Sequence, residues 1–454
     1  MEATAINRNL NDLPDEILLH ILTFFPTLDA VQTSLISRKW RPLWSRLRFL
    51  KFSYEHFPLN DPPSDNRDFF AEFVDRALIL RPHTPIELFS LSFIYHDRFG
   101  FHVDSWVRSA VRHLQARELH LDFFIHRDYH RTDETFNHKY DFPFCVLRDG
   151  AVAVLKLTRV DLTLPASVAT MGLASLSSMY LDEVYLTDQM VRDLISGCPN
   201  LDELELQNCW GMEKLKICSK RLKKLALAYI YDPDSKNTVE IDCPNLCSLS
   251  FDNCSFTQFV LKFAPALVEF NVRLVRITEQ DYVLWSRTVK LLEQAPYVKH
   301  LKLQNWWFKL LTSKDPLPKS VVLHNLNHLE LRTGYTQCDL VGLAALLELS
   351  PNLATMILHY LRKNMENRII PEEFVNKPDE FYMPSLKQVT MTSYTGTRDE
   401  DNFVSILKKH GVVLEKIIIH RIKVGEKSFS PVVVSKIPCK VQVQTGSSLL
   451  HRSS

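Results

Sequence analysis

The sequence predicts an α/β solenoid, preceded at the N-terminus by a small module of three helices. One observation is a short apolar motif that returns many times from about residue 85 onward. A second is the stretch before it, residues 11–52, where apolar residues recur at helical spacing in three successive runs. A third is the composition: 46% of the 454 residues are hydrophobic and 24% are charged. These values are ordinary for a folded protein and exclude a mostly disordered chain.

The recurring motif has the form apolar-x-x-apolar-x-apolar-x-x-apolar. Its two central apolar positions alternate with polar ones, which is the period of a strand with one buried face. Copies begin at Ala116, Val152, Leu176, Leu201, Leu222, Leu246, Leu267, Val298, Leu326, Leu353, Leu386 and Leu414, with a weaker copy at Leu88. The spacing averages about 27 residues, which is typical of leucine-rich repeats, whose units bury their inner faces only by stacking on one another.

The segments between the motifs favour a repeat array. Asp188–Cys198 and Leu340–Leu347 carry apolar residues at helical spacing. A proline that ends the preceding element stands just before the strand in four repeats, at Pro199, Pro244, Pro296 and Pro351. The alternative is an ordinary α/β domain with chance leucine spacing, but a proline that recurs at one phase of one period favours the solenoid.

Residues 11–52 predict three short helices. Pro14 suits the first turn of the first helix, and the acidic residues after it complement the helix dipole. A second helix is predicted from Leu28 or Asp29, and a third after Ser37, with a basic run as its solvated face: Arg38, Lys39 and Arg41. A unit of this size rarely has enough core to be stable alone. It is therefore expected either to cap the following domain or to complete its core against a partner.

The stretch from Leu13 to Trp44 resembles the F-box, particularly its plant form. Agreement runs over the whole module, through Leu13-Pro-Asp-Glu16, Ile21-Leu22, Asp29-Ala-Val31 and Ser37-Arg-Lys-Trp40. The resemblance implies docking on a Skp-family adaptor, which in turn joins a cullin ubiquitin ligase. Carried over by position, it implies roles in adaptor binding or in the module core, not separable from sequence, for Leu13, Pro14, Ile17, Leu18, Ile21, Leu22, Val31, Leu35 and Trp40.

A second resemblance lies near the C-terminus. Residues 383–419 are similar to the plant FBD domain, which follows leucine-rich repeats in a large plant F-box family. The segment predicts a strand–helix–strand unit that could close the end of a curved leucine-rich-repeat array. The expected division is an F-box module at 8–54, a linker and first helix at 55–84, leucine-rich repeats at 85–380, an FBD-like region at 381–444 and a disordered tail at 445–454.

The charge balance limits the class of binding partner, and the cysteine content indicates the cellular compartment. With 54 basic and 53 acidic residues, nothing drives the chain toward nucleic acid or an anionic membrane. Nine cysteines without a CxxC or zinc spacing indicate a reducing compartment, cytoplasmic and/or nuclear. The polar residues 1–11 do not fit a secretory signal, and no apolar run is long enough to span a bilayer.

No motif indicates catalysis. The scarce glycines (11) argue against a phosphate-binding loop, and no cofactor or metal site is expected. The predicted function is therefore that of a non-enzymatic substrate-recognition adaptor of a Skp-cullin-F-box ubiquitin ligase, with the repeats holding a target protein. Two alternatives stay open: a leucine-rich-repeat receptor for a small molecule, and a scaffold whose helical module binds something other than a ligase. The sequence does not identify the target, because exposed solenoid positions look like any polar surface.

Overall fold

The computed structural model describes residues 10–35, 37–58, 66–124, 138–165, 173–230, 238–254, 258–273, 292, 294–304, 322–335, 337–360, 381–422 and 429–434. The chain forms two compact units, Met1–Leu222 (unit 1) and Lys223–Ser454 (unit 2). The tail expected at 445–454 lies outside the described residues.

Unit 1 begins with the helical module. Helices α1 (Asp15–Leu22) and α2 (Thr27–Gln32) form as expected. They are flanked by 3-10 turns at Leu10–Asp12, Thr33–Leu35 and Trp44–Arg46. The prediction of a third α-helix is wrong, since residues 38–43 form turns. Pro42 stands inside this segment, lacks an N–H, and would clash with the carbonyl four residues earlier in a continuous helix.

A parallel sheet follows in unit 1. Its strands lie in the order β1 (Phe49–Ser53), β2 (Leu88–Ser92), β3 (Glu118–Asp122), β5 (Val154–Thr158), β7 (Ser178–Asp182) and β8 (Glu203–Gln207). The register aligns inward-facing residues from strand to strand: Leu119 pairs with Leu155, Leu155 with Met179, and Met179 with Leu204. All four are buried. The repeating motif therefore forms stacked strands, as the sequence predicts.

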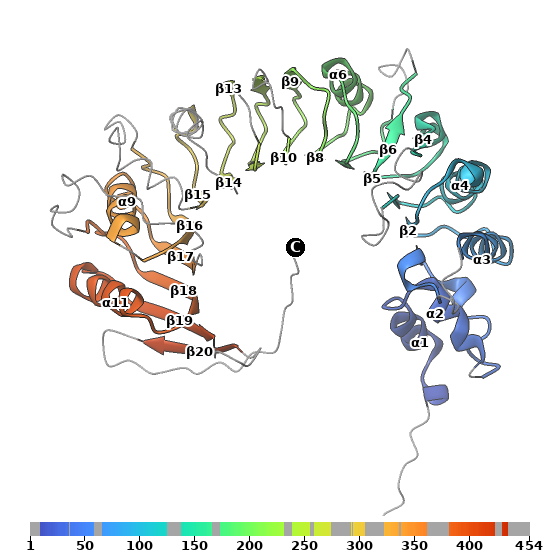
Figure 1. Ribbon diagram of the computed structural model, residues 1–454, viewed down its shortest axis with the longest axis horizontal. Helices are drawn as coiled ribbons and strands as arrows, with labels where there is room; N and C mark the ends of the chain where they lie inside the picture. The colour runs from blue at the N-terminus through green and yellow to red at the C-terminus, as the bar shows by residue number, and fades with distance from the viewer. Residues whose placement is uncertain are drawn as a thin grey trace, which may run out of the picture. The chain divides into compact units, whose positions relative to one another are not determined.

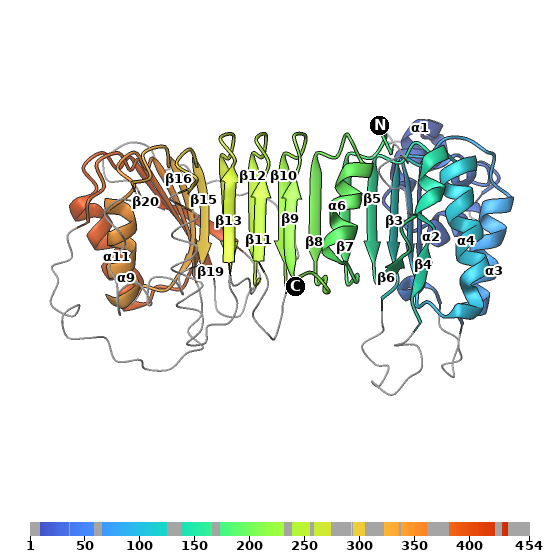
Figure 2. The ribbon, with the colours of Figure 1, turned by 90° about the horizontal axis from the view of Figure 1, so that it is seen from above.

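Helices cover one face of this sheet (Figures 1 and 2). They are α3 (Arg67–Ile79), α4 (Gly100–Arg108), which continues into a π-helical turn (Ser109–His113), and α6 (Asp188–Gly197). Shorter elements are β4 (Tyr140–Phe142), which pairs with β6 (Val160–Leu162), β9 (Lys214–Cys218), and 3-10 turns at Tyr54–His56, Asp97–Phe99 and Phe144–Asp149.

Unit 2 repeats the same plan. Its parallel strands are β10 (Lys224–Ala228), β12 (Ser248–Asp252), β14 (Glu269–Arg273), β15 (His300–Gln304), β16 (His328–Thr333), β17 (Thr355–Tyr360), β18 (Gln388–Tyr394) and β19 (Lys416–Ile422). A further parallel pair consists of β11 (Thr238–Asp242) and β13 (Gln258–Phe263). The helices are α9 (Gln337–Glu348) and α11 (Arg398–His410), and β20 (Phe429–Val434) pairs antiparallel with β19.

Two features of the sheet differ from the sequence interpretation. In β2 the inward residues are Phe89 and Leu91, flanked by buried Ile86 and Ile94, so the motif begins two residues before Leu88. The strand β1 was not anticipated, although buried Leu50 and Phe52 alternate with half-buried neighbours. Because it directly follows the helical module, its alternation over five residues gives too short a signal to separate from a helix end.

A turn of one conformation follows five of the strands. The residues after β5, β7, β8, β10 and β12 have positive φ: Arg159 (59°), Glu183 (52°), Asn208 (47°), Tyr229 (52°) and Asn253 (48°). Their amides extend the ladder, as the Glu183 N–H donates to the Gln207 carbonyl (3.1 Å) and the Tyr229 N–H to the Asp252 carbonyl (2.7 Å). Only asparagine and glycine adopt this conformation readily, so three of these five side chains are held against their preference by the repeat.

We expect Glu183→Asn to be more stable than Glu183→Val by about 1 kcal/mol or more, because a β-branched residue is strained at positive φ. Both variants remove the same charge from an exposed side chain, so the comparison isolates backbone conformation. Chemical denaturation of the two variants measures the difference. Equal stabilities would show that the turn after β7 relaxes to negative φ at no cost.

Candidate functional site

The helical module has a filled core of its own. Leu18, Leu22 and Trp40 are buried together with Ala30, Leu43 and Leu47, and Leu13, Leu19 and Trp44 pack against them. The polar residue Asn11 links the start of the module to its core: its Oδ1 accepts hydrogen bonds from the Trp40 Nε1–H (2.8 Å) and the Ser37 hydroxyl (3.0 Å). The module therefore does not need a partner to complete its interior.

Lys39 joins two distant segments of the module through hydrogen bonds. Its ammonium donates to the carbonyls of Asn11 (2.8 Å) and Leu13 (2.7 Å), and so ties the start of the module to its end. The sequence interpretation placed Lys39 on a solvated face together with Arg38 and Arg41. The latter two are exposed, but the interpretation is wrong for Lys39, because spacing alone does not reveal a carbonyl partner 26 residues away.

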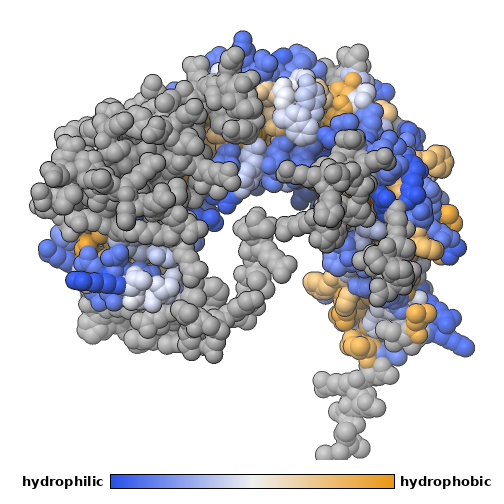
Figure 3. All heavy atoms as spheres, in the orientation of Figure 1, coloured by the Kyte–Doolittle hydropathy of each residue, from blue (hydrophilic) through white to orange (hydrophobic). Residues whose placement is uncertain are grey.

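The same module leaves large apolar side chains uncovered. Their exposed fractions are 60% for Leu10, 47% for Ile17, 73% for Phe24, 43% for Phe25 and 86% for Leu35. Ile17 lies on α1, and Phe24 and Phe25 lie in the turn that follows this helix. Figure 3 shows the hydrophobic residues that gather over α1 and α2. An exposed apolar cluster of this kind marks a protein-binding surface.

The structure sorts the nine residues for which the sequence left two roles open. Leu18, Leu22 and Trp40 are core residues; Leu13, Ile21 and Val31 are partly buried; Pro14, Ile17 and Leu35 are exposed. Sequence reasoning did not include Leu10, Phe24 and Phe25 among candidate contacts. Phe24 and Phe25 follow just after α1, and their spacing alone does not show that both are exposed.

The outward positions of the strands in unit 1 carry a second candidate surface. It is mainly acidic, and its carboxylates lie on neighbouring strands: Glu118, Asp122, Asp182, Glu203 and Glu205. Lys156 stands among them, paired in register with His120 on one side and Tyr180 on the other.

Several of these groups are in environments that oppose their charge. Burial, with a smaller contribution from Asp182, raises the pKa of Asp122 to about 6, although a hydrogen bond from Ser92 acts the other way. Burial likewise raises the pKa of Glu205. Burial, followed by the charge of Lys156, lowers the pKa of His120 to about 4. A cationic partner would stabilise the ionised carboxylates of this face.

The outward face of unit 2 is already paired within itself. Glu330 Oε1 accepts from Lys302 Nζ (2.6 Å) and contacts His359 Nε2 (2.8 Å). The hydrogen bond with His359 first, and Lys302 second, lower the pKa of Glu330 to about 2. On β14, Arg273 Nε donates to Asp252 Oδ1 (2.7 Å). These pairs hold the side chains of Glu330, Asp252 and their partners in place on this face.

Neither unit shows the features of a metal site or a membrane anchor in its described part. No three His, Cys, Asp or Glu side chains of the described residues come together as metal ligands would. None of the described helices combines the length and apolar character needed to cross a bilayer.

Comparison with known proteins agrees with both parts of the chain. Residues 10–52 match the F-box domain model, and residues 79–437 match the model described as At1g61320/AtMIF1, LRR domain. The latter match extends through most of the region expected to be FBD-like.

Curated relatives come from Arabidopsis thaliana. The F-box/FBD/LRR-repeat protein At5g56420 is 28% identical over 424 residues, which cover 90% of each chain. The F-box/LRR-repeat protein At3g59200 is 29% identical over 381 residues, 78% of this chain and 69% of its own. The FBD-associated F-box protein At5g56370 is 26% identical over 440 residues, 96% of this chain and 93% of its own.

A stacked array of parallel strands behind a helical module with an apolar outer surface defines a leucine-rich-repeat protein that carries an F-box. The chain belongs to the plant F-box/LRR/FBD protein family. The F-box generally binds a Skp-family adaptor, and these matches support a role in substrate recognition in general.

We expect Asp122→Asn to raise the free energy of unfolding at pH 7.5, by on the order of 1 kcal/mol. The folded-state pKa of about 6 lies above the usual value near 3.9, so the folded protein binds this proton more tightly than the unfolded chain. The stability from this group therefore falls as pH rises between about 4 and 6, and is lowest above 6.

Chemical denaturation at pH 7.5 and pH 4 tests this expectation. The gain should be present at pH 7.5 and absent at pH 4, whereas Glu213→Gln, an exposed charge loss in the same unit, should show no gain at either pH. An equal gain at both pH values would contradict the electrostatic explanation.

Proposed function

We propose that the protein is the substrate-recognition adaptor of a Skp-cullin-F-box ubiquitin ligase, and that it recruits a target protein through its leucine-rich repeats. The observation that carries the proposal is the exposed apolar surface on a module whose core is already filled. A cap on the following domain would use such side chains to cover that domain. Here Ile17 and Leu35 are 47% and 86% exposed in the folded chain.

The adaptor-binding residues are then the uncovered ones. Ile17, Phe24 and Leu35 offer apolar anchors of the kind that fit a groove on a partner. Arg46 forms an ion pair with Asp15 in the first turn of α1 (3.1 Å), and both side chains are about half exposed. This pair adds a polar edge to the apolar surface. Leu18, Leu22 and Trp40 support binding indirectly, because they hold α1 and the turns after Ser37 in place.

The repeats would hold the target on the outward positions of their strands. The inward positions pack from strand to strand and hold the array together, so the outward positions are the ones that can meet a target. Binding of a ligase at one end and a target at the other raises the local concentration of target lysines near the ubiquitin-conjugating enzyme, so that a bimolecular transfer becomes effectively intramolecular. No side chain of the chain itself has to take part in bond formation.

The C-terminal region is proposed to be FBD-like and to close the array. The segment β18–α11–β19 has the expected strand–helix–strand order. Helix α11 begins with a capping box in which Thr397 and the fully buried Glu400 bond reciprocally. The antiparallel strand β20 pairs along β19 and covers an edge that would otherwise invite pairing with another chain. The cytoplasm and the nucleus are the proposed locations, on the cysteine content of the sequence.

We expect Ile17→Asp to weaken binding of a Skp-family adaptor by at least about 10-fold, because it places a charge in an apolar contact. The protein should stay folded, since Ile17 lies outside the core. The measurement is a titration of the purified chain with a plant Skp-family adaptor by calorimetry or biolayer interferometry.

A matched control makes the result specific. Ile79→Asp introduces the same change at a 79% exposed isoleucine on α3, and should leave the affinity unchanged. Leu22→Asp is unsuitable, because it would bury a charge and unfold the module. If Ile17→Asp binds the adaptor as tightly as the unaltered chain, or if the unaltered chain does not bind it, the result would favour a scaffold that does not join a ligase.

A further inference from the structure

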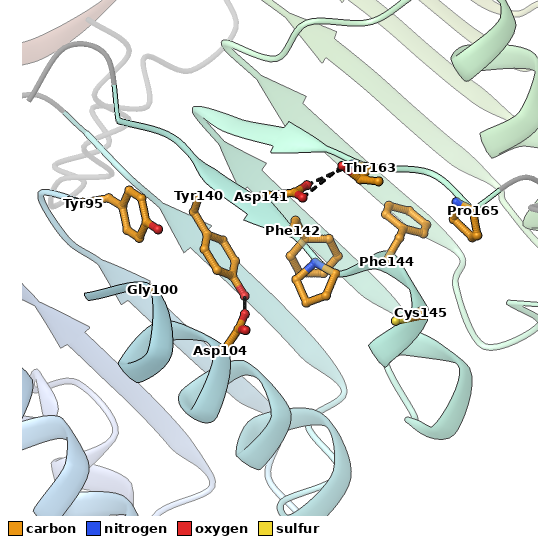
Figure 4. A pocket seen from close by; sticks show the side chains of 11 residues that line it. Tyr95, Gly100, Asp104, Tyr140, Asp141, Phe142, Phe144, Cys145, Thr163 and Pro165 are labelled. Atoms are coloured by element: carbon orange, nitrogen blue, oxygen red, sulfur yellow. Dashed lines mark hydrogen bonds between the residues drawn. The ribbon is translucent and has the colours of Figure 1, made fainter. Parts of the chain in front are cut away.

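A cavity of about 550 Å³ lies in unit 1 among α4, β4 and the 3-10 turn that follows β4 (Figure 4). This volume is within the range of small-molecule sites. Its lining includes Tyr95, Asp104, Tyr140, Asp141, Cys145 and Thr163. None of these residues belongs to the apolar surface of the helical module or to the strands β1, β2, β3, β5, β7 and β8 of the main sheet.

One hydroxyl in the lining, that of Tyr95, has no hydrogen-bond partner among the described residues. Tyr95 is only 8% exposed, and its hydroxyl makes no hydrogen bond to any residue that the structure describes. Figure 4 shows this hydroxyl turned toward the side where Tyr140 and Asp141 lie. Gly100 keeps the space beside it open, since a Cβ at that position would stand 3.2 Å from the hydroxyl oxygen. A hydroxyl that opens onto a cavity and makes no such bond is free to donate or accept one with a bound ligand.

Two carboxylates share the lining. Asp104 Oδ1 accepts from the Tyr140 hydroxyl (2.6 Å), and Asp141 accepts from the Thr163 N–H (3.1 Å) and hydroxyl (3.0 Å). These bonds orient the carboxylates but neutralise neither, and no described cation pairs with them. The two basic residues just before β4 contact other groups: His138 contacts Asp97 (2.7 Å), and Lys139 lies 3.9 Å from Asp161 and over the Trp210 ring.

We propose that this cavity binds a small organic cation, a guanidinium or alkylammonium group with an apolar stem. The N–H groups would donate to Asp104 and Asp141 and to the free oxygen of Tyr95, and the stem would lie against Pro143 and Pro165. Carboxylates recognise guanidinium with strong charge-assisted bonds. The same chemistry can come from a free amine or from an arginine side chain of a bound peptide.

The electrostatics of the cavity agree. Burial first, then the charges of Asp97, Asp104 and Asp141, raise the pKa of Tyr95 to about 12. Burial and the bond to Asp104 raise the pKa of Tyr140 as well. A site that disfavours the negative phenolate in both tyrosines also disfavours an anionic ligand.

The test is a calorimetric titration of the full chain with agmatine, with N-butylurea as a neutral analogue and Nα-acetyl-arginine N-methylamide as the peptide form. Agmatine should bind and the urea should not. Asp104→Asn and Asp141→Asn should each weaken binding by about 10-fold or more, and Glu213→Gln should not. A preference for agmatine or for the acetylated amide identifies a free amine or a side chain as the source.

Tyr95→Phe and Gly100→Ala separate binding from folding. Each should weaken agmatine binding while the melting temperature stays the same or rises, because the first removes an unpartnered hydroxyl and the second adds a helix former at the start of α4. Loss of stability without loss of binding would assign these residues a structural role only, and would overturn the proposal.

Cys145 provides an independent readout, since it is exposed and lines the cavity. Agmatine should slow its alkylation by N-ethylmaleimide several-fold, whereas Cys218 and Cys247, also exposed, serve as unaffected controls in the same molecule. Absence of both heat and protection at millimolar agmatine, equal binding of N-butylurea, or undiminished protection in the Asp104→Asn/Asp141→Asn double variant would each overturn it.

Discussion

The structure depends on the alignment of inward apolar residues from one parallel strand to the next. No single five-residue strand can bury its inner face, so each needs its neighbours on both sides. Burial of a large apolar side chain contributes about 2 kcal/mol, and a strand such as β5 supplies two such residues, Leu155 and Leu157. A positive φ at a non-glycine residue costs about 1 kcal/mol. The turns after β7 and β10, which place Glu183 and Tyr229 in that conformation, therefore persist because the packing they permit outweighs their strain.

The helical module solves the opposite problem, because it must be stable and still leave apolar surface uncovered. It does so with few residues. Leu18 and Leu22 face inward from α1, while Ile17 faces outward from the same helix. Asn11 and Lys39 then use polar bonds, to Trp40 and to the backbone carbonyls of Asn11 and Leu13, to hold the ends together. These bonds stabilise the fold without consuming the apolar side chains that a partner needs.

Periodicity predicted the strands that carry the apolar motif and missed the elements outside it. The strands from β3 to β19 at the repeat motif follow from their spacing, since a wrong register would turn Leu155 and Leu157 outward. Strand β20 and the pair β11–β13 lie outside the apolar motif, so the spacing of the motif does not indicate them. The third helix of the module was wrong because Pro42 prevails over the apolar spacing around it. The spacing predicted the nine apolar residues of the module as one group. It did not show which of them are buried and which are exposed, because this depends on the exact direction of each helix.

The cavity beside α4 shows the same limit for binding sites. Tyr95 follows β2, Asp104 lies on α4, and Asp141 lies on β4 after a long insertion in the repeat, so their proximity is produced by the fold and by no local motif. Among the described residues, the Tyr95 hydroxyl makes no hydrogen bond, and Asp104 and Asp141 accept bonds only from uncharged donors. Such groups are better guides to a ligand than the sequence around them, because a bound cation would supply the interactions that the described residues do not supply.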